Sequence, residues 1–189
     1  MIKAFVDSKS EWINEKKAVA LQRVAKPVRQ FISGEKFWLL GAQIPLRLVE
    51  NQSTALTLQN EFLLSNKARP QALEIFEKWY KVRALKVLSE RASLMAARHG
   101  FRYEKLRITS ARTRWGSCSS RGTLSFTWRL VMAPLEVIDY VVIHELAHLK
   151  IKNHSTVFWT EVARLMPAYK ISKDWLKKNG RLLTLDGDA

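Results

Sequence analysis

Three of the four histidines in this chain lie within eleven positions, and their spacing fits a metal site. His144 and His148 are four residues apart, so on a helix both imidazoles leave the same face one turn from each other. His154 follows after five intervening residues and would supply a third nitrogen once the chain turns back. Three neutral imidazoles can hold one Zn²⁺ and leave its fourth position open for water, which distinguishes a catalytic zinc site from a structural one.

Glu145 directly follows the first of these histidines and provides the carboxylate that hydrolysis at such a site requires. It can act as general base on the metal-bound water and return the proton to the leaving group. The surrounding segment, from Pro134 to about Lys152, is apolar on nearly every side, which predicts a buried helix. A titratable group inside such a helix needs a partner, because an unpaired buried charge is costly. A metal is the simplest partner; side chains satisfied by ordinary hydrogen bonds are the alternative.

Several short segments around this motif resemble one known family. They are residues 114–119, 130–134, 144–149 and 153–155, together with Phe158 and Trp159. The combination is similar to the YgjP-like family of predicted metal-dependent hydrolases, which in turn resemble the SprT and WLM zinc metallopeptidases. The resemblance covers residues 2–176 and is densest over residues 105–160.

The resemblance implies a fold, a cofactor and a set of site residues. The implied fold is an α+β zincin-like metallopeptidase core with an N-terminal helix and a small β-region. The implied cofactor is one Zn²⁺ per chain, held by His144, His148 and His154, with Glu145 as the catalytic base. Members of the family usually carry additional β-structure ahead of the segment that begins here at Met1. The resemblance therefore leaves three explanations for the N-terminal domain: a shortened gene, a late start-codon assignment or a real variant.

The remaining pattern predicts the elements that must position this site. Helices are expected over residues 8–31, 70–99, 134–152, 155–166 and 174–179, with Gly34 and Gly100 after the first two. Strands are expected over residues 37–40, 45–49, 55–58 and 62–64, as hairpins of a small antiparallel sheet, and over residues 105–109, 113–115 and 123–128. We therefore expect a helix and small β-region over residues 1–67, followed by the hydrolase domain over residues 68–189.

Other residues are candidates for binding substrate. Four could stabilise the negative charge that develops on a substrate oxygen, and the sequence does not choose among them: Arg114, Arg129, Tyr140 and Tyr169. The guanidinium groups of Arg114 and Arg129 also match phosphate oxygens bidentately. The strand over residues 123–128 could pair with an extended substrate by β-addition, as a sheet edge beside the metal helix.

Two acids are candidates for orienting the ligand histidines. A metal-bound histidine normally donates its other ring N–H to a carboxylate or a carbonyl, and Asp139 and Glu161 are the nearest acids in sequence. Glu161 lies seven residues after His154, on the same face of a shared helix. It is also the alternative third ligand, although an imidazole suits zinc well at that place.

Composition excludes several classes of protein. The chain of 189 residues is 47% hydrophobic and 26% charged, as is ordinary for a globular protein. No stretch approaches the ~20 apolar residues of a membrane helix, and residues 1–7 contain no apolar core of a signal peptide. The single cysteine, Cys118, cannot form an internal disulfide. A cytoplasmic protein without a membrane partner is expected.

The net charge of +15 bears on the substrate. Such an excess attracts nucleic acids, nucleotides and acidic proteins, but no nucleic-acid-binding motif accompanies it, and solvated helix faces are the more ordinary explanation. Three functions therefore compete. They are hydrolysis of a peptide bond, release of pyrophosphate from a nucleoside triphosphate such as UTP, and nucleic-acid binding by a chain with a vestigial metal site.

Overall fold

The computed structural model describes residues 29–185. In chain order it contains β1 (Lys36–Leu39), β2 (Ala42–Val49), β3 (Leu56–Leu58), β4 (Phe62–Ser65), η1 (Asn66–Gln71), α3 (Ala72–His99), β5 (Lys105–Thr109), β6 (Gly116–Cys118), β7 (Thr123–Thr127), η2 (Trp128–Met132), α4 (Leu135–Ala147), α5 (Thr156–Leu165), α6 (Tyr169–Asn179) and η3 (Gly180–Leu182). This mixture of helices with two small sheets confirms the α+β prediction. The helix expected over residues 8–31 lies outside the described residues except for its last three, which are not helical.

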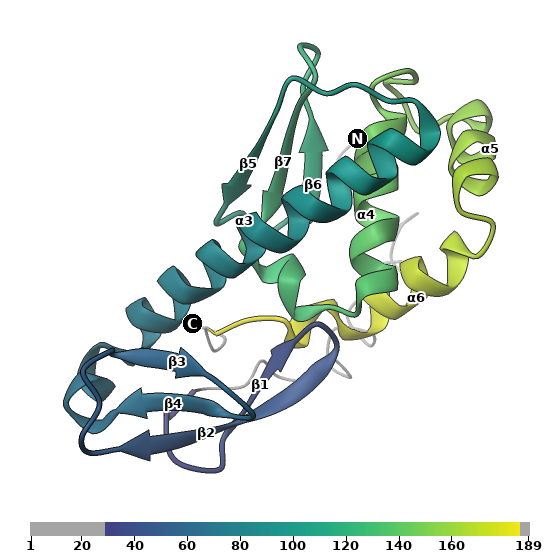
Figure 1. The fold of residues 1–189 in the computed structure, drawn as a ribbon. Helices are drawn as coiled ribbons and strands as arrows, with labels where there is room; N and C mark the ends of the chain where they lie inside the picture. Colours follow the sequence, from purple (N-terminus) through teal and green to yellow (C-terminus); the bar gives the residue numbers. More distant parts are fainter. Residues whose placement is uncertain (1–28, 186–189) are drawn as a thin grey trace, which may run out of the picture.

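Both sheets pack against the 28-residue helix α3. Its buried residues, among them Phe76, Tyr80, Ala84 and Leu88, recur at helical spacing along one face. It ends as expected at Gly100, whose φ of 69° lies in the left-handed region that glycine adopts without strain. In Figure 1 the four-stranded sheet lies at the N-terminal end of α3, and the three-stranded sheet lies along its C-terminal half.

The N-terminal sheet departs from the prediction in one pairing. Its strand order is β1-β2-β4-β3, and the outer pairs are antiparallel as expected. The central pair, β2 and β4, is parallel, with Leu46 opposite Phe62, so the prediction of a wholly antiparallel sheet is wrong. The physical reason is burial, because all four residues of β4 are buried and such a strand belongs in the interior of a sheet. The short strand β3 takes the outer edge instead.

The second sheet corrects two expectations. Its order is β5-β7-β6, with β7 parallel to β5 and antiparallel to β6. Because β7 is the central strand, the hypothesis that residues 123–128 pair with substrate as a sheet edge is wrong. The edge beside α4 belongs to β6, which comprises residues 116–118 rather than the expected 113–115. A Gly-Ser-Cys strand carries no apolar alternation, and this explains why the pattern misplaced it.

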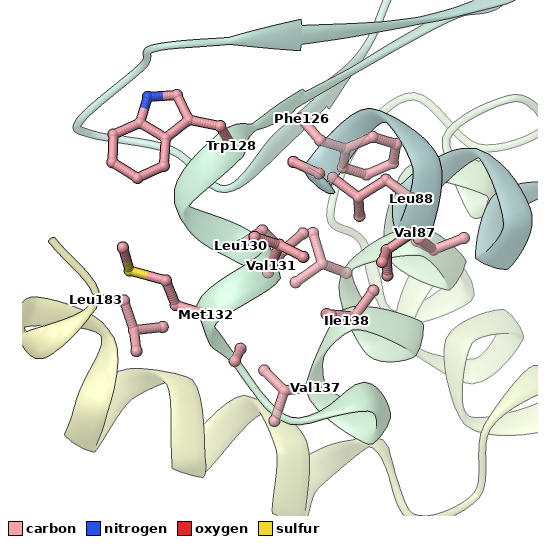
Figure 2. Close-up of a cluster of buried hydrophobic side chains, with 14 of the residues drawn as sticks. Val87, Leu88, Phe126, Trp128, Leu130, Val131, Met132, Val137, Ile138 and Leu183 are labelled. Atoms are coloured by element: carbon pink, nitrogen blue, oxygen red, sulfur yellow. The ribbon is translucent and has the colours of Figure 1, made fainter. Parts of the chain in front are cut away.

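Buried side chains between the two sheets hold the N-terminal end of α4 in place. Figure 2 shows side chains from α3 (Val87, Leu88), η2 (Leu130, Val131) and α4 (Ile138) meeting in one buried cluster. The turn between β1 and β2 reaches the same place, where the N–H of Gly41 donates to the carbonyl of Met132 at 3.1 Å. Gly41 has a φ of 83°, and a Cβ added to it would lie 2.8 Å from Cγ of Pro134. The N-terminal sheet therefore holds the residue that directly precedes α4.

The last two helices complete the surroundings of α4. α5 covers nearly the expected range, with Ser155 as its N-cap. α6 begins at Tyr169 rather than near Asp174, because Tyr169, Ser172 and Leu176 give the longer helix a buried face. One buried apolar cluster extends through both predicted domains, and the boundary near residue 67 stays a prediction. Within residues 29–185, none of the helices combines the length and the apolar character that a membrane span requires.

Candidate metal centre

The three clustered histidines lie on two segments that meet at the C-terminal end of α4. His144 is in the last turn of this helix and His148 caps it, because α4 ends at Ala147 and not near Lys152 as expected. The N–H groups of the two residues after His148 bond to carbonyls only three positions back, a tightening that is common at helix ends. This early end lets the following loop carry His154 back to the helix.

The three imidazoles converge through their Nε2 atoms. The Nε2 of His154 lies 3.0 Å from that of His144 and 3.2 Å from that of His148. Among residues 29–185, these three histidines form a group whose ligand atoms all lie within 4.8 Å of one another. Nitrogens bound tetrahedrally to one zinc ion at ~2.1 Å would be about 3.4 Å apart. The observed separations therefore fit a single ion with little rearrangement.

The chemistry of the donor set also fits a metal. Nδ1 of His148 lies 2.9 Å from the carbonyl oxygen of Ile151. A carbonyl can only accept, so Nδ1 donates the hydrogen and Nε2 keeps its lone pair for the cluster. Burial, together with the neighbouring histidines, lowers the pKa of His144 to about 3, and burial also lowers the pKa of His148. Both rings are thus neutral at physiological pH, which is the state that binds a metal.

Glu145 is buried beside this cluster, with 5% of its surface exposed. Burial raises the pKa of its carboxyl to about 7, against an opposing attraction to Arg114. Gly116, the first residue of β6, packs directly on the carboxylate, where a side chain would not fit. The glycine brings the backbone of the sheet edge into contact with the acid.

Two adjacent hollows open onto the site. The first, of about 220 Å³, is here named the Glu145 hollow; its lining includes Arg114, Trp115, Gly116, Tyr140, His144, Glu145 and Leu176. The second, of about 270 Å³, is named the histidine hollow and is lined by the three strand residues of β6 with His144, Glu145, His148, Lys152 and His154. Both hollows contain Gly116 and Glu145, so the sheet edge borders the two of them continuously.

Aromatic rings pack around the histidines. The ring of Phe158 stacks on His148 with centroids 4.4 Å apart, and Trp159 lies 5.9 Å from His154. Trp159 in turn stacks on Tyr169 at 5.6 Å, and Tyr169 stacks on Tyr140 at 6.3 Å. These rings replace water around the cluster, and the lower local polarity strengthens electrostatic interactions within it.

Comparison with known proteins agrees with this geometry. The family model described as "YgjP-like, metallopeptidase domain" matches residues 1–179. The chain belongs to the YgjP-like family. It is therefore a metal-dependent hydrolase, and the resemblance found in its sequence is confirmed. A search of curated proteins found no match.

Two solved structures of archaeal metallopeptidase zymogens are similar to part of this YgjP-like chain. One is abylysin of Pyrococcus abyssi, which is 26% identical with a TM-score of 0.45, over 51% of this chain and 99% of that chain. The other is jannalysin of Methanocaldococcus jannaschii, which is 22% identical with a TM-score of 0.41, over 48% of this chain and 91% of that chain.

The four candidate substrate residues of the YgjP-like domain are not all at the site. Arg114 and Tyr140 line the Glu145 hollow. Tyr169 is buried and packs behind Tyr140. Arg129 lies elsewhere, because its guanidinium covers the ring of Trp128 at 4.3 Å and donates to a backbone carbonyl, that of Ser110, at 3.1 Å. Only two of the four side chains border the hollow that contains Glu145.

Within residues 29–185, neither expected acid contacts one of the three clustered histidines. Asp139 accepts a 2.6 Å hydrogen bond from Nε of Arg91 on α3, as part of a two-point ion pair. Glu161 accepts a 2.8 Å hydrogen bond from Arg164, which lies on its own helix. A carboxylate binds a nearby guanidinium more strongly than a neutral imidazole, so both acids are drawn away from the histidines. The expectation that they orient the ligand rings is corrected, and for His148 a backbone carbonyl does so.

Sequence reasoning missed three contributors to the site. Nothing in the sequence marks the backbone carbonyl of Ile151 as a partner of His148, because every residue carries a backbone carbonyl. The contact of Gly116 with Glu145 did have a signal, since an isolated glycine in a strand often marks a close backbone approach. Lys173, whose ammonium lies 3.9 Å from the ring centroid of Trp159, comes from a helix whose start was placed too late.

Proposed function

We propose that this protein hydrolyses peptide bonds, with one Zn²⁺ held by His144, His148 and His154 and with Glu145 as general base. The observation that carries the proposal is the meeting of three ring nitrogens, separated by 3.0 and 3.2 Å, beside a buried carboxylate. Zinc at such a site polarises the substrate carbonyl and lowers the pKa of the attacking water. The chain's own residues supply binding, orientation and proton transfer.

Glu145 is placed to move the proton in this proposal. It follows His144 directly, so the same helical turn carries the base and the first ligand. Its carboxylate would accept a proton from the attacking water and then donate it to the leaving amine. Gly116 covers the carboxylate on one side, and this enclosure limits exchange of the proton with bulk water.

The edge of β6 that faces away from β7 is proposed to bind the substrate chain. Within residues 29–185, β7 is the one strand that pairs with β6, so the other side of β6 offers backbone donors and acceptors to an extended peptide. Its residues, Gly116, Ser117 and Cys118, line the histidine hollow, which puts a bound peptide beside the ligands. The role hypothesised for residues 123–128 thereby passes to the neighbouring strand.

Tyr140 is proposed to bind the oxyanion that forms on the substrate. It lines the hollow that contains Glu145, and burial raises its pKa to about 12, so its hydroxyl remains a hydrogen-bond donor at neutral pH. Tyr169 stacks on Tyr140 and restricts the ring. Arg114 shares the hollow and is proposed to contact the substrate further along its chain.

Hydrolysis of a nucleoside triphosphate is the second candidate function. Arg114 beside Glu145 favours it, because a guanidinium binds phosphate oxygens well. It also depended on Arg129, which packs on Trp128 and does not line the Glu145 hollow. Peptide hydrolysis is therefore the better-supported function. Nucleic-acid binding with a vestigial site is the least supported, since three clustered histidines beside a buried carboxylate favour a working site.

One assay series tests the proposal. The metal content of the purified protein is measured first, and about one zinc per chain is expected. Cleavage of an unfolded protein is then compared with pyrophosphate release from a nucleotide panel, each with and without a chelator. We expect chelator-sensitive protein cleavage that is absent from a Glu145→Gln variant. Pyrophosphate release without protein cleavage would replace the proposal by the second candidate.

A further inference from the structure

A third hollow lies beside the metal centre and differs from it in charge. It has a volume of about 260 Å³, and five of its lining residues are basic: Arg112, Arg114, Arg129, Lys177 and Arg181. No acidic residue is among the described residues that line it. We name this hollow the basic pocket. Its positive lining is complementary to a ligand with several negative charges.

The basic pocket adjoins the Glu145 hollow. Arg114, Trp115 and Leu176 line both, so the two spaces share a wall. The wall is closely packed, because a Cβ added to Gly180 would lie 2.8 Å from the ring of Trp115. The basic pocket therefore has a fixed position relative to Glu145.

Two of the five basic side chains, those of Arg114 and Lys177, give the most direct support for an anionic ligand. Within residues 29–185, neither Arg114 nor Lys177 forms a salt bridge. Arg114 enters from the loop before β6, and Lys177 enters from α6. Carboxylates held between these two side chains would gain charge-assisted hydrogen bonds without displacing a salt-bridged partner.

The direction of β6 relates the pocket to a bound peptide. Antiparallel pairing is the more stable kind, so a peptide on this edge would run from the Cys118 end of the strand toward the Gly116 end. Residues after the cleaved bond would then extend toward Arg114. This arginine precedes Gly116 by two residues, which span at most about 7 Å. The second and third residues after the cleaved bond would therefore reach the mouth of the basic pocket.

We infer that the basic pocket selects peptides with acidic side chains two or three residues after the cleaved bond. This inference rests on the proposed peptidase function and adds a substrate class to it. The net charge of +15 attracts acidic chains from a distance, and the pocket gives that attraction a defined position along the substrate.

Matched synthetic peptides test the inference. All share one cleavable bond; one carries Glu at the second and third positions after it, one carries Gln there, and one carries Glu at the same distances before it. We expect kcat/KM for the first to exceed that for the second by about two- to thirtyfold, the combined range of two exposed charge pairs. The preference should shrink as the salt concentration rises.

Two exposed lysines on α6 provide a matched pair of variants. Lys177 lines the basic pocket and Lys178, the next residue, does not. Lys177→Gln should reduce the preference for the acidic peptide, and Lys178→Gln should retain it. Equal cleavage of the Glu and Gln peptides would overturn the inference and leave the peptidase proposal intact, whereas cleavage of none of the peptides would overturn both.

Two further outcomes would also overturn the inference. One is a preference for Glu before the cleaved bond rather than after it. The other is competitive inhibition by a single-stranded oligonucleotide that Lys177→Gln relieves, without any preference for Glu, because the pocket would then bind phosphates.

Discussion

A Cβ built on Gly116 would lie 2.6 Å from Oε1 of Glu145, closer than any ordinary contact between such atoms. The edge of β6 and the buried carboxylate therefore fix each other in place. This contact joins the strand proposed to bind substrate to the helix that carries two of the ligands. It positions the base relative to a bound peptide without any hydrogen bond between side chains.

Replacing Gly116 by alanine should reduce activity while leaving zinc in place. The added methyl group must displace the carboxylate or the strand, and an error of about 1 Å at a reacting group can cost roughly 100-fold in rate. The measurement is kcat together with zinc content. Ser125→Ala, in the paired strand β7, is the matched control and should keep its activity. Normal kcat in Gly116→Ala would contradict a positioning role for this contact.

Removal of a ligand and removal of the base should have separable effects. His154→Ala should abolish tight zinc binding, because two imidazoles remain of three. Glu145→Gln should retain zinc and lose roughly 10²- to 10⁴-fold in kcat. His99, the fourth histidine, lies at the end of α3 outside the cluster, so His99→Ala is the control for the loss of an imidazole. A zinc-loaded His154→Ala variant would refute the proposed ligand set.

The local parts of the site could be read from the sequence. The ligand spacing, the adjacent glutamate and the apolar helix are properties of a few consecutive residues, so His144, His148 and His154 could be identified together. The long helix before Gly100 was recognisable for the same reason. Its period and its stop signal are both local.

The rest depended on contacts between distant residues. Asp139 pairs with Arg91, 48 positions earlier, and nothing near the acid in sequence indicates that partner. The parallel pairing of β2 with β4 likewise arises from burial in the assembled sheet and not from either strand alone. Prediction from alternating apolar residues favours apolar strands. The strand β6 begins at Gly116 and has no such alternation, so it was placed three residues too early.

Tyr140→Phe should lower kcat more than it changes KM. If the hydroxyl donates to the oxyanion, its loss removes an interaction made mainly in the transition state, worth roughly 10²- to 10³-fold. Tyr103→Phe is the control, because that hydroxyl lies 3.2 Å from Ser93 on the surface. An unchanged kcat in Tyr140→Phe would pass the oxyanion role to Arg114, the other candidate in the hollow.

Asp139→Asn should destabilise the fold without affecting zinc binding. It removes one charge from a partly buried ion pair that joins α4 to α3, at a cost of about 1–3 kcal/mol in the free energy of unfolding. Chemical denaturation of Asp139→Asn, Arg91→Gln and the double variant gives the coupling between them. The exposed Asp174→Asn is the control. Loss of zinc from a folded Asp139→Asn protein would restore the expectation that this acid orients a ligand.

Removal of the metal should lower the melting temperature of the protein. The proposed zinc ion would bind the folded arrangement of His144, His148 and His154, which the unfolded chain does not hold together, so binding would add to the free energy of unfolding. Zinc at about 100 times its Kd adds roughly 2.7 kcal/mol, and this corresponds to a rise of roughly 5–10 °C for a chain of this size. Thermal unfolding of chelator-treated protein, with and without added zinc, measures the shift. The zinc-dependent shift in melting temperature should be small in His154→Ala and complete in Glu145→Gln. An equal shift in both variants would mean that zinc is bound somewhere other than the three histidines.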